Sequence, residues 1–167
     1  VFLRLSRSHP KFLEKLFEAE APELTNGTVV VKAIAREAGY RSKIATESLG
    51  NSHIDPVGAL VGQRGVRVST VMSELRGEKI DIIEWSAEPK KFIEEALSPA
   101  KILKIEINES EKTATVSVSE DQQSLAIGKG GQNVRLAAKL TGWRIDIQSA
   151  KGEELAVADV PEDNKTI

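Results

Sequence analysis

Two short stretches of the sequence combine glycines with a basic residue at a spacing suited to binding a phosphate backbone. They read Gly62, Gln63, Arg64, Gly65 and Gly128, Lys129, Gly130, Gly131. Glycine has no Cβ, so another molecule's ribose-phosphate backbone can lie directly against the main chain. A helical pattern follows each stretch, and a helix N-terminus offers unpaired N–H groups and the positive end of its dipole. The pattern predicts two phosphate-binding loops with Arg64 and Lys129 as mobile charges.

The two loops lie within a longer internal repeat. Residues 55–60 align with residues 121–126 at an offset of 66, and residues 79–82 align with residues 144–147 at an offset of 65. Residues 10–13 also resemble residues 89–93. Self-similarity on this scale indicates two copies of one small domain. We expect these domains at residues 9–86 and 87–149.

Composition limits the classes of protein to consider. The chain has 167 residues, a net charge of −2 and no Cys, which is compatible with a reducing, cytoplasmic location and excludes thiolate metal sites. No hydrolase or nucleotide-binding motif is present, and His9 and His53 lack the spacing of metal ligands. We therefore expect no enzyme activity, no catalytic residue, no metal and no cofactor. With this net charge, nucleic-acid binding requires a local basic patch.

Each copy contains the elements needed to hold its loop. The order in both is helix, strand, strand, short helix, loop, helix, strand, so the fold class is α+β. Pro10 and Pro89 begin the first helices, and Asp55 and Asp121 are expected to cap the short ones. Val68 and three further apolar residues predict one buried helix face.

The sequence also supports predictions for the two ends and for the first hairpin. Residues 1–6 alternate like a strand, and residues 150–167 are predicted to be a flexible acidic tail. The hairpin charges Arg36, Arg41 and Lys43 are expected to be exposed.

The element order and the amino-acid sequences of several segments resemble those of a known family. A helix, a Gly-x-x-Gly loop and a second helix beside a three-stranded sheet look like a KH domain of the type II, prokaryotic topology. The segments 34–45, 55–59, 77–82, 96–101 and 125–137 are similar to the tandem KH region of the NusA family of bacterial transcription factors. The resemblance covers residues 6–148. It implies two tandem type II KH domains, with residues 1–8 as the end of a preceding OB-fold domain and its linker.

The resemblance also implies a function. A rigid tandem KH module of this family would bind single-stranded, nascent RNA and regulate polymerase pausing, termination and antitermination. RNA polymerase and other transcription factors would be partners through the full-length protein, with no membrane contact and a monomeric state. Expected RNA-binding residues are the two loops and their flanking positions: Gly62, Gln63, Arg64, Gly65, Arg67, Gly128, Lys129, Gly130, Gly131, Gln132, Asn133 and Arg135.

Other interpretations of these features stay open. Both loops could be plain helix–helix turns, and Arg67 and Arg135 could be solvated surface charges. The chain could be a protein-interaction scaffold that keeps the KH fold without using its groove, an alternative that the net charge and the uncharged Gly130 leave open. It could also be the KH module of another bacterial RNA-processing or ribosomal protein.

Overall fold

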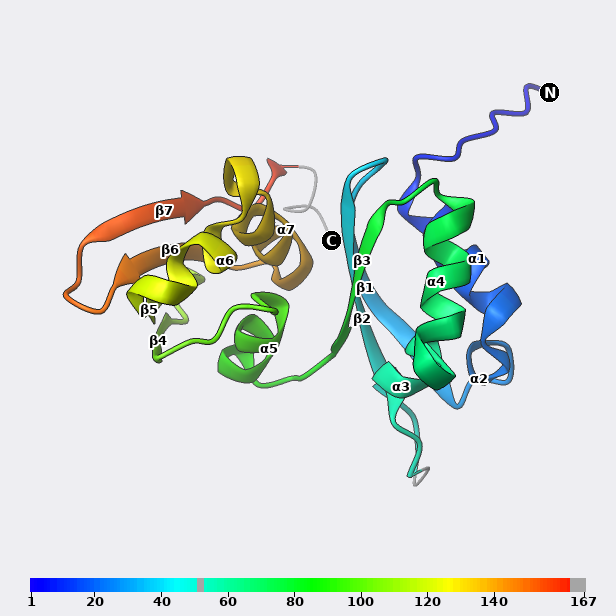
Figure 1. Cartoon of the computed structure of the whole chain (residues 1–167), viewed down its shortest axis with the longest axis horizontal. Coiled ribbons are helices and arrows are strands. Elements are labelled where there is room, and N and C mark those ends of the chain that lie inside the picture. Colours follow the sequence, from blue (N-terminus) through cyan, green and yellow to red (C-terminus); the bar gives the residue numbers. More distant parts are fainter. Residues whose placement is uncertain (51–52, 163–167) are drawn as a thin grey trace. The chain divides into compact units, whose positions relative to one another are not determined.

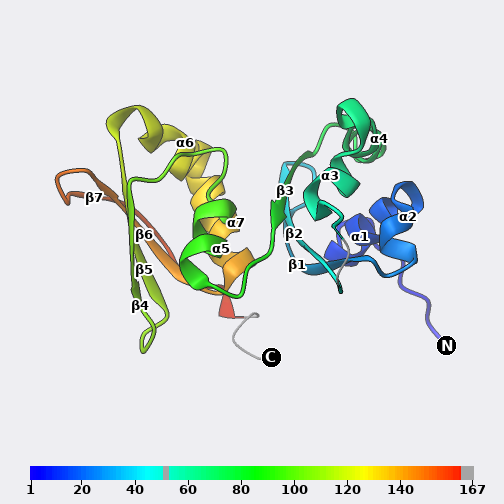
Figure 2. The ribbon, with the colours of Figure 1, turned by 90° about the horizontal axis from the view of Figure 1, so that it is seen from below.

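A computed structural model describes residues 1–50 and 53–162 of the chain. It divides into two compact units, Val1–Trp85 and Ser86–Ile167, one residue before the expected boundary. In each unit, helices cover one face of a small sheet (Figures 1 and 2). Among the described residues, no helix is both long and apolar enough to cross a membrane. Nor does any group of three or more His, Asp or Glu in these residues have a geometry that could hold a metal ion.

The first unit places three strands beside its helices. Its elements are α1 (Pro10–Glu20), α2 (Pro22–Thr25), β1 (Val29–Glu37), β2 (Arg41–Ser48), α3 (Pro56–Val61), the 3-10 turn η1 (Gln63–Gly65), α4 (Val66–Glu74) and β3 (Lys79–Glu84). The central strand β2 pairs antiparallel with β1 and parallel with β3. A parallel pair needs a crossover connection, and here the connection carries α3, the loop and α4. The loop is therefore held between two helices that pack on the sheet.

Local sequence signals explain where these helices begin. His9 is the N-cap of α1, and its Nδ1 accepts a hydrogen bond of 3.1 Å from the Lys11 amide. Asp55 caps α3 by accepting from the Val57 amide at 3.0 Å, as the sequence predicts. The apolar faces of α1, α3 and α4 meet β1 and β2 in one core: Leu13, Phe17, Val29, Ile44, Ala59, Leu60, Val71 and Leu75.

The second unit repeats this plan and adds one strand. Its elements are α5 (Pro89–Ala96), β4 (Lys104–Asn108), β5 (Thr113–Val118), η2 (Glu120–Gln122), α6 (Gln123–Ile127), η3 (Lys129–Gly131), α7 (Gln132–Thr141), β6 (Arg144–Ser149) and β7 (Glu154–Ala158). The strand order is β4-β5-β6-β7, with β5 and β6 parallel and both other pairs antiparallel. Two tandem KH-type α+β domains are the result.

The structure differs from the sequence-based expectation at both ends and at one cap. Residues 1–6 form no strand, and no strand among the described residues pairs with them. Residues 154–158, predicted to lie in a flexible tail, form β7 on the free edge of β6; residues 163–167 of that tail lie outside the described part. Asp121 does not cap α6, because a 3-10 turn precedes this helix and the Asp121 carboxylate instead accepts from the Gln122 side chain at 3.0 Å.

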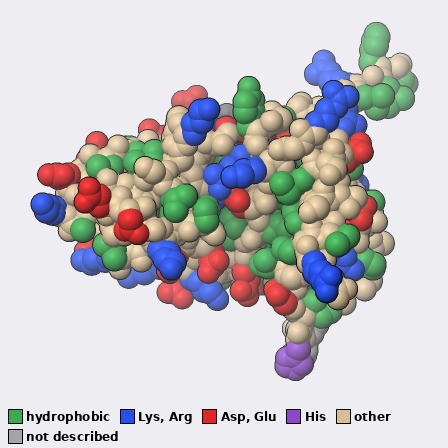
Figure 3. Space-filling model, in the orientation of Figure 1, with side chains coloured by type: hydrophobic (Ala, Val, Ile, Leu, Met, Phe, Trp, Pro, Cys, Tyr) green, Lys and Arg blue, Asp and Glu red, His purple; other side chains and the backbone are tan. Residues whose placement is uncertain are grey.

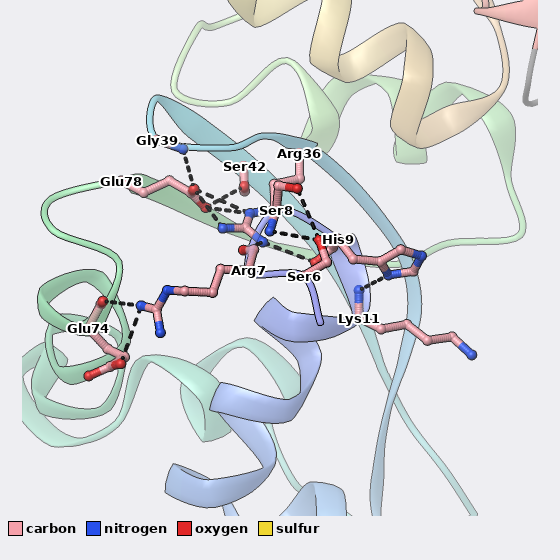
Figure 4. A network of polar contacts seen from close by, with 10 residues as sticks. All are labelled: Ser6, Arg7, Ser8, His9, Lys11, Arg36, Gly39, Ser42, Glu74 and Glu78. Atoms are coloured by element: carbon pink, nitrogen blue, oxygen red, sulfur yellow. Dashed lines mark hydrogen bonds and ion pairs between the residues drawn. The ribbon is translucent and has the colours of Figure 1, made fainter. Parts of the chain in front are cut away.

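The hairpin charges Arg36 and Lys43, expected to be exposed, are buried, and the Arg41 side chain is only 13% exposed. The Arg36 guanidinium pairs with Glu78, which also accepts hydrogen bonds from the Gly39 amide and the Ser42 hydroxyl (Figure 4). Lys43 Nζ lies 2.9 Å from an Asp81 carboxylate oxygen that also pairs with Arg41. The hairpin charges are thus satisfied inside the fold, by carboxylates about 40 residues away in sequence.

Burial lowers the pKa of Lys43 from its ordinary 10.5 to about 8, although Asp81 partly opposes the shift. Between these two pH values the unfolded chain binds a proton that the folded chain does not, so the free energy of unfolding should rise from pH 8 to pH 10.5. In the wild type, Lys43 should contribute a rise in the free energy of unfolding over this pH range, measured by urea unfolding. We expect the Lys43→Met variant to lack that contribution. Trp85 fluorescence in a Trp143→Phe background reports on the first domain. Identical pH dependence in both proteins would contradict the prediction.

Candidate nucleic-acid interface

The first loop joins α3 to α4 in a conformation that requires glycine at its first position. Gly62 has φ 74° and ψ 171°, a region that is open essentially only to glycine. The Gly62 amide ends α3 by donating to the Gly58 carbonyl at 2.9 Å, and the Gly65 amide donates to the Gly62 carbonyl at 3.1 Å. The loop is therefore one tight turn fixed at both ends.

The second loop has the same backbone geometry. Gly128 has φ 77° and ψ 168°, and its amide donates to the Ser124 carbonyl at 2.9 Å. The Gly131 amide donates to the Gly128 carbonyl at 3.1 Å, matching the closing bond of the first loop. Gly65 and Gly131 are both left-handed, at φ 74°. The repeat seen in the sequence is therefore also a repeat of local structure.

Each loop ends at the N-terminus of a helix that has no capping side chain. Gly65 is the N-cap of α4 and Gly131 is the N-cap of α7, and neither helix has a side-chain capping bond. Glycine cannot supply the oxygen that Ser, Thr, Asp or Asn would provide. First-turn N–H groups and the positive end of the helix dipole thus face the loop, an arrangement suited to an anion such as phosphate.

The two middle residues of each loop are exposed: Gln63 and Arg64 in the first, Lys129 and Gly130 in the second. Each loop thus carries one exposed basic side chain. Beside the first loop lies an open groove of about 650 Å³, lined in part by Gly62, Gln63 and Arg64. Elsewhere, basic and acidic side chains are interspersed on the face shown in Figure 3, in keeping with the net charge of −2. On this face no extended area of one charge sign stands out.

The basic residues occupy different positions in the two loops. Arg64 has φ 55° and ψ 26°, the left-handed region that non-glycine residues rarely adopt. Gly130, at the equivalent position of the second loop, adopts almost the same angles, φ 61° and ψ 24°, without a Cβ. The first loop therefore carries its charge at a strained position, whereas the second carries it one residue earlier on Lys129.

Arg67 is the second residue of α4, next to the first loop, and its guanidinium is already engaged within the domain. Its Nη1 donates to a Glu23 carboxylate oxygen at 2.8 Å and to the Ala59 carbonyl at 2.6 Å. The side chain is 29% exposed. Arg67 thus links α4 to α2 and α3 inside the domain.

The flanking residues of the second loop take different positions. Gln132 is the half-buried first residue of α7, and the exposed Arg135 donates to the Gly130 carbonyl at 3.0 Å. Asn133, which the sequence predicts to contact RNA, is fully buried. Its Nδ2 donates to the carbonyls of Leu97 and Ala126, both at 3.0 Å. Burial under α5 and α6 leaves this side chain no surface for a ligand.

The sequence did not indicate that Glu23 and the Leu97 carbonyl accept hydrogen bonds from the residues that follow the two loops. Glu23 is 44 residues from Arg67, and Leu97 is 36 residues from Asn133. No local pattern marks either of them. The left-handed conformation of Arg64, by contrast, could have been inferred from its alignment with Gly130.

Comparisons with known proteins agree with this geometry. A family model described as the NusA-like first KH domain matches residues 7–85, and one described as the NusA-like second KH domain matches residues 89–155. The transcription termination/antitermination protein NusA of Halalkalibacterium halodurans is 54% identical over 158 residues, which is 94% of this chain and 41% of that protein. The Bacillus subtilis protein of the same name is 56% identical over 145 residues, 87% of this chain and 39% of that protein.

A solved structure shows the same fold. The crystal structure of APE1850 covers 83% of this chain and 97% of its own, with a TM-score of 0.58 and 23% sequence identity. This chain spans about two fifths of the length of the two relatives named above. The two domain models together cover nearly all of its described residues. The chain therefore belongs to the NusA family and corresponds to the tandem KH region of its members.

Proposed function

We propose that this tandem KH region binds single-stranded RNA through both Gly-x-x-Gly loops. The observation that carries the proposal is the repeated geometry: two loops with nearly equal backbone angles, each ending at an uncapped helix N-terminus. RNA phosphates would lie on the first-turn N–H groups of α4 and α7, with Arg64 and Lys129 adding charge. Bases would occupy the groove beside the first loop and the corresponding surface of the second domain, since a KH module holds about four nucleotides.

The contact set that we propose is narrower than the one predicted from the sequence. It keeps the two loops together with Gln132 and Arg135, because these residues are exposed or half-buried. It leaves out the buried Asn133 and the paired Arg67. Because both domains lie on one chain, binding of one makes the second contact nearly intramolecular. Within full-length NusA, we propose that nascent RNA is captured in this way and that pausing, termination and antitermination respond to it.

The test is a titration with unstructured RNAs of about ten nucleotides, enough for two sites of about four nucleotides each. If about four phosphates are neutralised, a slope of roughly −0.7 per contact predicts on the order of 50-fold weaker binding across a fourfold rise in salt. A variant with Gln63→Asp, Arg64→Asp, Lys129→Asp and Gly130→Asp should lose binding. Asp tolerates the left-handed conformation, so the loops should keep their shape.

A matched variant separates charge repulsion from loss of the loop surface. Asn at the same four positions has nearly the shape of Asp without its charge, so we expect binding weaker than wild type but stronger than with Asp. Unaltered binding by the Asp variant would overturn the proposal, as would a wild type that binds no RNA. Retained binding to RNA polymerase or another factor in the absence of RNA binding would favour the scaffold interpretation.

A further inference from the structure

The residue five positions after the first glycine has an equivalent structural place in both domains. It is Arg67 in the first domain and Asn133 in the second, since 67 − 62 equals 133 − 128. In both, this residue packs against the first glycine of its loop. A Cβ built on Gly62 would lie 2.6 Å from Arg67 Cγ, and one built on Gly128 would lie 2.8 Å from Asn133 Cβ. The side chain that follows the loop thus covers the loop's own first residue.

In the first domain this side chain ties three helices together. Arg67 is on α4; its Nη1 reaches the Ala59 carbonyl of α3 at 2.6 Å and the Glu23 carboxylate of α2 at 2.8 Å. Ala59 lies in the last turn of α3, where carbonyls have no partner within the helix. The bond therefore fixes the helix before the loop to the helix after it. Glu23 neutralises the guanidinium, so Arg67 offers little free charge to a phosphate.

In the second domain a neutral group makes an equivalent connection. Asn133 is on α7, and its Nδ2 donates to the Ala126 carbonyl of α6 and to the Leu97 carbonyl that follows α5. Again the helix before the loop and the helix after it are joined at one side chain, although the third partner is the end of α5, the first helix of its domain, and not a counterpart of α2. Different chemistry thus joins the two helices that flank the loop in both copies, which indicates that this connection itself is what matters.

We infer that Arg67 and Asn133 are positioning residues that hold the two Gly-x-x-Gly loops in their binding conformation. The inference rests on the proposed RNA binding. A loop that is competent for only a fraction of the time binds with a dissociation constant raised by the inverse of that fraction. Both residues would act through the loop, without binding an RNA phosphate.

The first test needs no RNA. Amide hydrogen exchange is measured for both loops in the wild type, Arg67→Met and Asn133→Leu. We expect faster exchange at residues 62–65 in Arg67→Met and at residues 128–131 in Asn133→Leu, each variant's other loop serving as its control. Unchanged exchange at the variant's own loop would overturn the inference. Arg67 is partly exposed, so Arg67→Met should fold even if the buried Asn133→Leu does not.

The second test separates positioning from phosphate contact. If the competent population of the first loop falls to about a tenth, Arg67→Met should weaken RNA binding about tenfold. The salt slope should stay unchanged, whereas the control Arg64→Met should reduce its magnitude by about 0.7. A lower slope in Arg67→Met would show that Arg67 contacts phosphate and would overturn the inference.

A double-variant comparison completes the test. Where Gln63→Asp and Arg64→Asp have already disabled the first loop, Arg67→Met should have almost no further effect on RNA binding. An undiminished tenfold loss in that background would mean that Arg67 acts independently of the loop. Failure of the wild type to bind RNA would contradict the proposed function, and the exchange measurement would still decide whether these side chains hold the loops.

Discussion

Replacing Glu78 by Gln is expected to destabilise the first domain by about 3–5 kcal/mol, the usual cost of breaking a buried ion pair from one side. The Glu78 side chain is fully buried, and that of Arg36 is 3% exposed. Glu78 accepts from Arg36 Nε at 3.0 Å, the Gly39 amide at 2.7 Å and the Ser42 hydroxyl at 2.9 Å. Gln would remove the negative charge, and its amide NH2 group would face N–H and O–H groups that are themselves donors. The guanidinium would remain buried without its counter-charge.

The same network contains a matched control. Arg7 and Glu74 form an ion pair at 3.4 Å whose side chains are 64% and 55% exposed (Figure 4). Exposed pairs of this kind contribute about 0–1 kcal/mol, so Glu74→Gln should change stability little. Urea unfolding of both variants is followed by Trp85 fluorescence in the Trp143→Phe background. A Glu78→Gln cost no greater than that of Glu74→Gln would contradict the prediction.

The partner substitution tests the cause of this cost. With Arg36→Met and Glu78→Leu combined, no unpaired charge remains in the interior, and apolar replacements of buried pairs are often neutral or stabilising. We therefore expect the double variant to recover most of the stability that either single change removes. Arg36 also donates to the carbonyls of Arg7 and His9, at 2.8 and 3.0 Å. Any loss that the double variant keeps measures these contacts with the segment entering α1, together with the Gly39 amide and the Ser42 hydroxyl, which lose Glu78 as their acceptor.

The fold was predictable from the sequence to the extent that its signals are local. The repeated glycine loops, Asp55 as a cap and the apolar stripe on α4 each depend on residues within about one or two helical turns. β7 was not predictable in this way. Its five residues, Glu154–Ala158, form a strand because the edge of β6 is available to pair with them, and β-structure depends on such context.

The same distinction applies to the candidate site. The loop positions follow from the motif, and the structure shows the two middle residues of each loop exposed and its first and last glycines half-buried. Arg67 and Asn133 look alike in the sequence, as polar residues in the first turn of a helix. Only the tertiary positions of Glu23 and Leu97 show that one is paired and the other buried. A motif in the sequence therefore cannot show whether a neighbouring polar side chain is free to bind a ligand or has its partners within the protein.

Gly128→Ala is expected to have the largest effect of any single change in the second loop. Its φ and ψ angles lie in the glycine-only region, which alone costs about 1–3 kcal/mol for another residue. A Cβ there would also lie 2.7 Å from the Asn133 backbone nitrogen, which cannot move without shifting α7. At Gly62 the closest atoms are Cγ and Cβ of Arg67, at 2.6 and 2.9 Å, so Gly62→Ala would displace a side chain and no backbone atom and should cost its own domain less.

Gly130→Ala is the control for backbone conformation, because Gly130 is left-handed but a Cβ there would meet no atom within 4 Å. It should cost only about 1–2 kcal/mol. Urea unfolding read from Trp143 fluorescence in a Trp85→Phe background compares Gly128→Ala with Gly130→Ala. Equal costs would refute the close approach as the reason for Gly128. If the expected order is found, loss of RNA binding in Gly128→Ala reflects a damaged loop. Loss in a folded Gly130→Ala would instead locate the RNA at the exposed side of the loop.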